Sequence, residues 1–307
     1  MRTGASFAVR SFAAIVLFSA AGFAAESKTS GPRISFKLTG GGQYISIGDL
    51  NTSFDSWAHT LPSRSYDVAK AMKIDCWFAT WEAELRFDLS RKIAVGIALS
   101  NALHRTKQAD FPLYDRASDD PVPVGSFASD ATIDVRSPIR ISAYYTLPLS
   151  PTTNLLFDMG IGYYSGRMQE SLDCEYFEDW HRSTWQTEWR SALGFHGGVS
   201  LEYVFSTRFS FVLDAQLRRA VLTDFPATMD LDTNMVPTGF YFDESGTLYL
   251  ARWDEDGPFG IGTQEFYVWA TAPNGPVGGM FGARSLGPAR LDLSGFSLRA
   301  GIRIALF

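Results

Sequence analysis

The sequence predicts an all-β fold: an antiparallel, up-and-down transmembrane β-barrel of eight strands. Three observations lead to this prediction. Apolar residues recur at every second position over long segments, these segments come in closely spaced pairs, and one short apolar segment stands at the N-terminus. The mean hydropathy of -0.04 excludes a bundle of membrane-spanning helices, because each such helix needs about 20 consecutive apolar residues.

The composition is that of a folded chain. Of the 307 residues, 46% are hydrophobic and 14% aromatic, and the net charge is only -6, which argues against disorder. Two Cys are too few for a disulfide-built scaffold. The acidic balance and the lack of a basic stripe disfavour a nucleic-acid partner. Arg accounts for 21 of the 27 basic residues, a bias that the fold has to explain.

Residues 1–25 are expected to be a secretory signal peptide. Arg2 and Arg10 supply the positive charge, residues 11–23 form a short apolar core, and Ala24 and Ala25 suit a cleavage site. An uncleaved membrane anchor is the alternative. The remaining chain, residues 26–307, is expected to form one barrel outside the cytoplasm.

Eight segments alternate with a period of two, which is the pattern of a strand with two different environments. In the second segment, Trp77, Trp81 and Leu85 share one face, whereas Glu82 and Glu84 share the other. Most of the segments are long enough for the 9–11 tilted residues that cross a bilayer. They span residues 33–47, 76–89, 93–103, 133–147, 155–163, 189–205, 209–217 and 293–307.

The connections between these segments alternate strictly between short and long. That layout predicts tight periplasmic turns and long outer loops, with both termini on the periplasmic side. The longest connection is rich in aromatic residues, and its parts 247–253 and 263–271 could add a hairpin and make ten strands; eight are preferred because Gly and Pro interrupt these parts. The short connections are 90–92, 148–153 and 206–208, and the long ones are 48–74, 106–130, 169–186 and 224–292.

The polar face of the strands is expected to point into the barrel. Eight strands enclose room for little beyond side chains, and this face carries the small and charged residues. Its acids and cations balance, as a dry interior requires, and Arg suits bidentate pairing with carboxylates. A solvated sheet face is the alternative. The predicted lumen charge network consists of Lys37, Glu82, Glu84, Arg86, Asp88, Asp134, Arg136, Arg140, Asp158, Glu188, Arg190, Glu202, Asp214, Arg218, Arg299 and Arg303.

Aromatic residues gather at both ends of the apolar face, as at the two interfaces of a membrane. One predicted belt, toward the loops, holds Trp77, Trp81, Trp185 and Trp189. The other, toward the turns, holds Phe87, Tyr145, Tyr203, Phe205, Phe209 and Phe211.

The final segment, residues 301–307, ends in Phe307 and resembles the last strand of bacterial outer-membrane β-barrel proteins. It departs from their pattern because its apolar residues are even-numbered and Phe307 is odd. The eight-strand layout is similar to small barrels of the OmpA/OmpX type, and the segment 40–51, with three Gly and then Gly-Asp-Leu-Asn, is loosely similar to other outer-membrane barrels. The resemblance covers residues 33–307. It implies a monomer in the bacterial outer membrane, with outer-membrane lipid, lipopolysaccharide and the barrel-assembly machinery as partners and Phe307 as the assembly signal.

Catalytic, metal and cofactor sites are not predicted. The four His (His59, His104, His181 and His196) show no specific spacing to a Ser and an acid, so no enzyme is expected. The run Asp230-x-Asp232-x-Asn234 lacks the Gly and the distant Glu of a calcium loop.

Cys76 and Cys174 are both predicted near the outer ends of strands. In an oxidising compartment a disulfide between them is one expectation, and two free thiols are the other.

The functional expectation is a barrel with a plugged polar lumen and a structural or surface-binding role through its outer loops. A porin-like conduit for small or hydrophobic solutes is the alternative, and a lipid-modifying enzyme is a weaker one.

Overall fold

The computed structural model of the chain describes residues 33–60, 73–114, 123–233, 240–253, 266–272 and 285–306. The predicted signal peptide (residues 1–25), the predicted assembly signal Phe307 and Asn234 lie outside the described residues. The side chain of His59 lies outside them as well. Within these ranges no helix combines the length and the apolarity needed to span a membrane.

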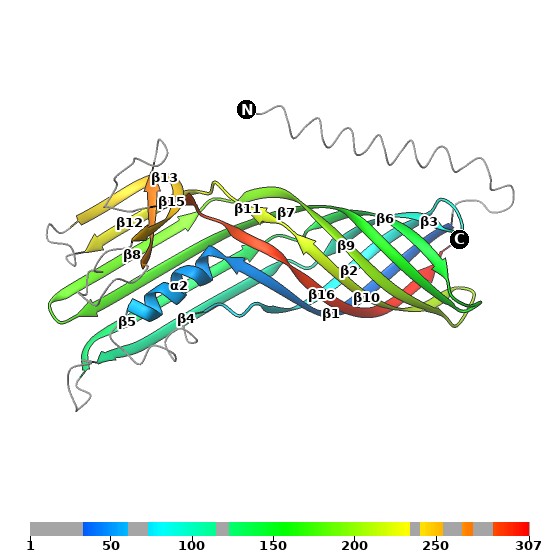
Figure 1. Cartoon of the computed structure of the whole chain (residues 1–307), viewed down its shortest axis with the longest axis horizontal. Coiled ribbons are helices and arrows are strands. Elements are labelled where there is room, and N and C mark those ends of the chain that lie inside the picture. Colours follow the sequence, from blue (N-terminus) through cyan, green and yellow to red (C-terminus); the bar gives the residue numbers. More distant parts are fainter. Residues whose placement is uncertain are drawn as a thin grey trace.

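A closed circuit of antiparallel strand pairs forms one half of the molecule (Figure 1). Each strand pairs with the next, and the last pairs again with the first. We call this half the circuit. Its strands, in order, are β1 (Arg33–Gly48), β2 (Trp77–Asp88), β3 (Ile93–Ser100), β6 (Ile139–Pro148), β7 (Thr153–Tyr176), β9 (Arg190–Val204), β10 (Phe209–Arg219) and β16 (Leu291–Ala305).

Three tight turns close one end of the circuit. They join β2 to β3, β6 to β7 and β9 to β10, and each is held by a backbone hydrogen bond, such as Leu89 N to Ile93 O at 2.9 Å and Leu149 N to Thr153 O at 2.9 Å. These turns are the three short connections of the sequence. The ends of β1 and β16 lie at the same end of the circuit, where Ser35 pairs with Ala305.

The sheet continues beyond the opposite end of the circuit as a second half, which we call the upper sheet. Its order is β4, β5, the distal part of β7, β8, β12, β13 and β14, and two short strands join at its margins. The bounds are β4 (Leu103–Tyr114), β5 (Pro123–Val135), β8 (Asp179–Thr187), β11 (Val221–Leu222), β12 (Pro226–Thr233), β13 (Phe240–Trp253), β14 (Phe266–Ala272) and β15 (Ser285–Pro288).

The number of strands therefore differs from the expected eight. One all-antiparallel sheet of 16 strands runs through the described residues. Much of three predicted long loops is paired strand: the segment 106–130 lies in the β4–β5 hairpin, 169–186 in the β7–β8 hairpin, and 224–292 contributes β12 to β15. The long connections lengthen the sheet because their strands continue those of the circuit.

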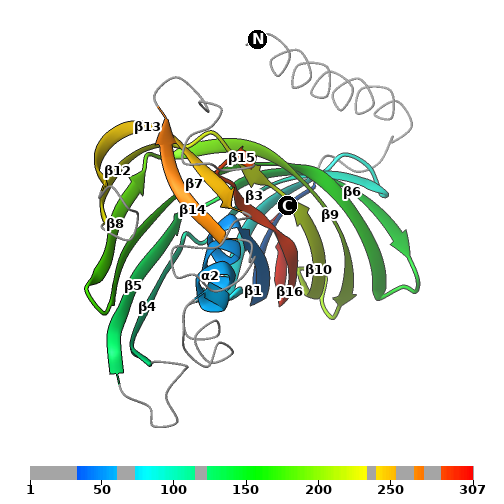
Figure 2. The same cartoon turned by 60° about the vertical axis from the view of Figure 1, so that its left-hand side comes forward.

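The helix α2 (Asp49–Thr60) lies within the curve of the sheet (Figure 2). Gly48 precedes it with a φ of 76°, a left-handed conformation that Gly adopts without strain, and this turn takes the chain from β1 into the helix. Asp49 Oδ2 accepts a hydrogen bond from Arg290 N at 2.9 Å, which fixes the start of the helix to the strand region before β16. Leu50 and Phe54 are fully buried against the upper sheet.

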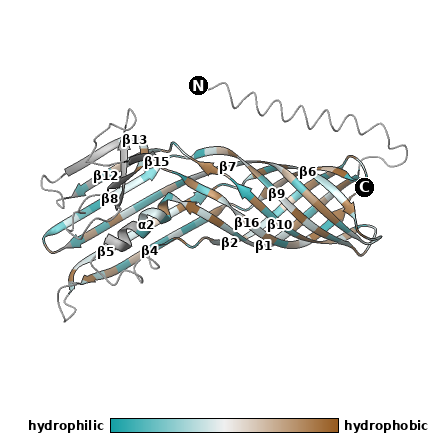
Figure 3. Cartoon of the chain, viewed as in Figure 1, coloured by the Kyte–Doolittle hydropathy of each residue, from teal (hydrophilic) through white to brown (hydrophobic). Residues whose placement is uncertain are grey.

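The two halves have opposite polarity, and β7 shows the change within one strand. In the circuit its apolar side chains Met159 (67% exposed) and Tyr163 point outward. From Tyr164 on, the apolar side chains, such as Met168 and Leu172, point inward and are buried. Figure 3 shows hydrophobic and hydrophilic residues alternating along the circuit strands. The apolar core of the molecule consequently sits inside the upper sheet, whereas the circuit has a polar interior.

Candidate functional site

A cluster of buried charges fills the middle of the circuit. Lys37 of β1 lies at its centre, with its Nζ 2.8 Å from Glu84 Oε2, 3.2 Å from Asp214 Oδ2 and 3.4 Å from Glu82 Oε1. All four side chains are almost fully buried. The strand register brings them together because Lys37 is paired directly with Glu84 across β1 and β2.

Two arginines complete the cluster from the other side. Arg140 and Arg299 both form ion pairs with Glu82. Arg299 Nη2 also lies 3.3 Å from Asp214 Oδ1, and Gln216 accepts hydrogen bonds from both guanidinium groups. Three carboxylates and three cations thus neutralise one another at almost fully buried positions, and such pairing is the condition for keeping charges buried.

Further members lie around this centre. Arg303 pairs with Glu202, Arg86 Nε lies 3.1 Å from Asp88 Oδ1, and Gln216 Nε2 donates to Asp158 Oδ2 at 3.3 Å. Tyr144, which the sequence did not single out, donates its hydroxyl to Glu84 Oε2 at 2.7 Å. Arg218 instead donates to the carbonyl of Leu293 at 2.7 Å.

Four predicted members of the network lie elsewhere. Asp134, at the end of β5, accepts hydrogen bonds from His104 Nδ1 at 2.7 Å and from Arg167 Nε at 2.8 Å. Arg136 and Glu188 are exposed, and Arg190 donates to the carbonyl of Asp224 at 2.5 Å. The expectation that these four face the interior of the circuit is therefore corrected. They lie near the junction of the circuit and the upper sheet, where the inward side chains change from polar to apolar.

Two very small cavities are lined mostly by described residues of the circuit. One, lined by Lys37, Glu84 and Arg303 among others, has a volume of about 10 Å³. The other, at the upper end beside Tyr164 and Arg218, is also about 10 Å³. A single water needs about 10–15 Å³ measured this way. At these two places the described side chains leave room for about one water each.

Ser142 and His196 form a hydrogen-bonded pair inside the circuit, with Oγ and Nε2 2.8 Å apart. Gly160 of β7 lies between them in the register, and a Cβ there would come within 2.7 Å of His196 Nε2. His196 Nδ1 has no hydrogen-bond partner among the described residues. Within the described part of the chain, no third group orients this imidazole through Nδ1, as a catalytic His would require.

The two cysteines are both free thiols, which is the second of the two expectations for this pair. Cys174 points into the apolar core of the upper sheet between Phe127 of β5 and His181 of β8, and burial raises the pKa of its thiol to about 12. Cys76 precedes β2, and its Sγ lies 3.5 Å from Asn51 Nδ2 of α2.

The apolar outer face of the circuit carries aromatic side chains at both ends. Trp77 and Trp81 are about half exposed toward the upper sheet, and Tyr203, Phe209 and Phe211 are exposed toward the turns. Trp185 differs from the expectation: it is 1% exposed, inside the upper sheet, and donates its Nε1 to Glu170 Oε2 at 3.0 Å.

Trp189 lies on the outside, where β8 gives way to β9, and two guanidinium groups lie over its ring. The Cζ of Arg136 is 4.1 Å from a ring centroid and the Cζ of Arg167 is 5.2 Å away. Arg136 has no carboxylate partner among the described residues. Hydrogen bonds from His104 and Arg167 lower the pKa of Asp134 beside them, although burial alone would raise it.

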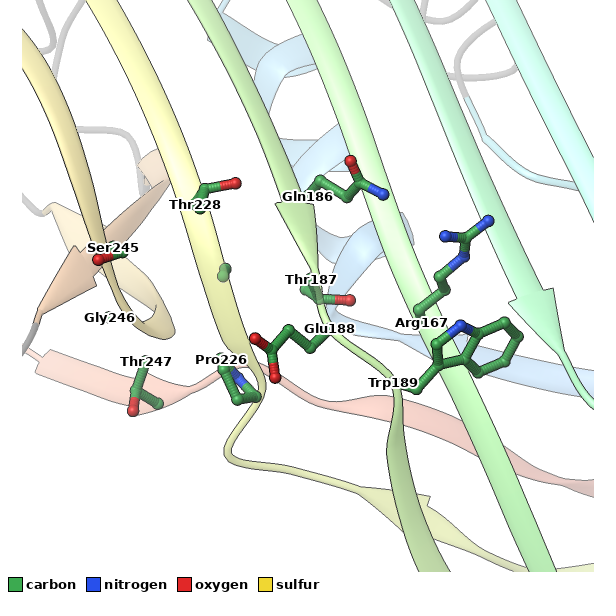
Figure 4. Close-up of a pocket in the computed structure, with 11 residues that line it drawn as sticks. Arg167, Gln186, Thr187, Glu188, Trp189, Pro226, Thr228, Ser245, Gly246 and Thr247 are labelled. Carbon is green, nitrogen blue, oxygen red and sulfur yellow. The ribbon is translucent and has the colours of Figure 1, made fainter.

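A cavity of about 780 Å³ opens beside Trp189 on the outer face of the upper sheet (Figure 4). Sequence reasoning missed it because β8, β12 and β13 were taken for loops. The described residues hold no cluster of three or more His, Cys, Asp or Glu side chains suited to a metal ion. The lining residues are Arg167, Gln186, Thr187, Glu188, Trp189, Pro226, Ala227, Thr228, Ser245, Gly246 and Thr247.

Comparison with known proteins identifies the family. No curated protein matches the chain. Residues 11–242, more than half of the chain, match the outer membrane protein beta-barrel domain, a match that agrees with the closed antiparallel circuit and its apolar outer face. The chain therefore belongs to the outer membrane protein β-barrel family and resides in the bacterial outer membrane.

Proposed function

We propose that the protein is a non-conducting outer-membrane barrel that holds a folded binding surface above the membrane. In this proposal the eight strands of the circuit are the membrane-spanning barrel, with the tight turns on the periplasmic side. The upper sheet then stands on the outer side. The protein acts through this sheet and not through a pore.

The filled interior carries the proposal. A conducting pore needs a continuous water-filled path, whereas the barrel interior holds the buried ion pairs of Lys37, Arg140 and Arg299, and the cavities beside them have room for about one water each. Breaking one of these pairs to open a path would leave a charge buried without a partner, at a cost of several kcal/mol.

The upper sheet supports the second part of the proposal. It has its own apolar core, sealed by Leu50 and Phe54 of α2, and polar outward residues such as Asp173 and Arg182. An antiparallel sheet with an apolar inner face and a polar outer face is suited to have its outer face in water. Because its strands continue those of the barrel, it presents a fixed surface for partners.

Planar-bilayer recording tests the closed lumen. The purified full chain is reconstituted at a range of protein concentrations, with a water-filled porin recorded in parallel as the positive control. We expect no stable, reproducible current steps from this protein. Reproducible single-channel steps that scale with salt concentration would overturn the closed lumen and support the porin-like alternative.

A further inference from the structure

We propose that the outer face of the upper sheet, just above the barrel, binds the phosphorylated sugar headgroup of an outer-leaflet glycolipid, with Arg136 and Arg167 on the phosphate. The inference rests on the proposed function, since it takes the upper sheet as the outer side. It assigns a ligand class to the cavity beside Trp189.

The fold brings the three residues together from three different elements. Arg136 lies in the link between β5 and β6, where its backbone N donates to Ser165 O of β7 at 2.9 Å. Arg167 is two residues further along β7. Trp189 lies in the link between β8 and β9, next to Arg190, which pairs with Gly166. All three positions are thus at the level where the strands leave the barrel and enter the upper sheet.

The guanidinium groups are held in place by the indole ring. At 4.1 Å and 5.2 Å from a ring centroid, Arg136 and Arg167 are both within the range of cation–π attraction to Trp189. Such stacking leaves the N–H edges of a guanidinium free to donate. Those edges form the planar fork that matches the oxygens of a phosphate.

The local charge balance leaves room for an anion. Arg167 is paired with Asp134, but that carboxylate also accepts from His104. Arg136 has no carboxylate beside it in the described part of the chain. Around the Trp189 ring, two guanidinium groups therefore share one carboxylate, that of Asp134, and Arg136 is left to pair with a bound anion. Glu188 also lines the cavity, but no ion pair joins it to either arginine among the described residues.

The position relative to the membrane selects a lipid as the source of that anion. Directly below the site, the outward side chains Ile139, Tyr163 and Leu193 are about half exposed and belong to the apolar outer face. Above it, Asp173 and Arg182 are exposed and form an ion pair in water. A cation at this boundary meets lipid phosphates at headgroup depth.

The cavity indicates what else the headgroup carries. Its lining supplies hydroxyl and amide groups from Gln186, Thr228, Ser245 and Thr247, which suit the hydroxyls of a sugar. Its volume of about 780 Å³ is within the usual range of ligand sites. Figure 4 shows the Glu188 carboxylate turned toward Pro226, on the other side from Arg167 and Trp189, so it does not occupy the phosphate position.

The test compares two forms of one glycolipid on the purified full chain in detergent. The probes are lipid A with its phosphates and the same lipid after dephosphorylation, and binding is followed by native mass spectrometry and by tryptophan fluorescence. We expect the phosphorylated form to bind about tenfold more tightly or better, as a charge-assisted contact implies. Arg136→Gln should remove about tenfold of the affinity for the phosphorylated form and leave the dephosphorylated form unchanged, and Arg136→Lys should restore part of the loss.

The matched control is Arg208→Gln, which removes an exposed arginine in the β9–β10 turn and should leave both affinities unchanged. Equal binding of the two lipids by the unaltered protein would overturn the proposal, and this comparison needs no variant to fold. Inorganic phosphate that binds as tightly as the lipid would identify a soluble anion as the ligand and also overturn it. The bilayer recordings separate the two proposals, because a closed lumen without lipid discrimination contradicts the headgroup site alone.

Discussion

Lys37 and Glu84 face each other across β1 and β2 and form an ion pair inside the barrel, with Nζ and Oε2 2.8 Å apart. Their backbones are register partners, so the pairing of the two strands places both charges at the same height. The same lysine reaches Glu82 and Asp214, which lie on β2 and β10. One side chain therefore links β1, β2 and β10 electrostatically across the interior.

Lys37→Met should destabilise the barrel strongly. The change leaves three buried carboxylates with only Arg140 and Arg299 as counter-charges, and removing one partner of a buried pair typically costs about 3–5 kcal/mol. Urea unfolding in detergent, followed by tryptophan fluorescence, measures the loss. Lys92→Met, at an exposed position in the β2–β3 turn, is the matched control and should change the free energy of unfolding by less than about 0.5 kcal/mol.

Arg140→Gln and Arg136→Gln should differ sharply although the residues are close in sequence. Arg140 is buried against Glu82, so its loss should cost about 3 kcal/mol or more. Arg136 is exposed, and its replacement should shift the free energy of unfolding by only about 0.5 kcal/mol. Parallel urea titrations decide between this expectation and a lumen position for Arg136, which would make the two variants equally unstable.

Phe54→Ala should loosen the upper sheet while the barrel stays folded. Phe54 is 0% exposed in the core between α2 and the sheet, and such truncations cost about 3–5 kcal/mol. Hydrogen–deuterium exchange should speed up in β4, β5 and β8 but not in β2 or β10. Thr52→Ala, on the exposed side of the same helix, is the control. Faster exchange throughout the barrel would mean that the two halves unfold as one unit.

Cys174 should resist thiol reagents in the folded protein. Its side chain is buried and its pKa is raised to about 12, so at pH 8 the thiol is both protonated and inaccessible. Maleimide labelling followed by mass spectrometry should therefore modify Cys174 only after denaturation. In Cys76→Ser, the folded protein should take up no label at all. For the unaltered protein, an intact mass lower by two hydrogens would instead reveal a disulfide between Cys76 and Cys174 and contradict this prediction.

Asp134→Asn should weaken the β4–β5 region at neutral pH and not in strong acid. The folded-state pKa of Asp134 is lowered, so its stabilising contribution is complete above the ordinary aspartate pKa of about 3.9 and is lost as the pH falls through the lowered value. We expect a loss of about 1 kcal/mol at pH 7, measured as faster hydrogen exchange in β5. Asp130→Asn, nearby on β5, serves as the comparison; a difference for Asp134→Asn that persists unchanged at pH 2 would contradict the ion pair.

The sequence predicted the barrel strands because their two faces meet very different surroundings. An apolar outer face and a polar interior require large apolar residues to alternate with small or charged ones, as in β2, where Leu85 points out and Glu84 points in. The three short connections also fixed which strands are joined by tight turns. The charged centre followed from the same parity, including Lys37, Glu82 and Arg299.

The upper sheet escaped prediction because the alternation changes phase without stopping. In β7 the apolar residues are mostly odd-numbered up to Tyr163 and even-numbered from Tyr164, because the polar interior of the circuit gives way to the apolar core of the upper sheet. A prediction that follows one continuous apolar face therefore ends the strand at Tyr163 and treats the following residues as a loop. Arg136 was misplaced for the same reason, since the parity of β5 and β6 does not extend through the link between them.

The length of β7 has a mechanical consequence. This strand runs for 24 residues through both halves without a break, about 80 Å at 3.3 Å per residue. Neighbouring strands pair with β7 in both halves, so hydrogen-bonded sheet and not a flexible link joins them. A force on the far end of β7 would therefore act on the barrel as a torque. The tilt of the barrel in the membrane would in turn set the orientation of the upper sheet.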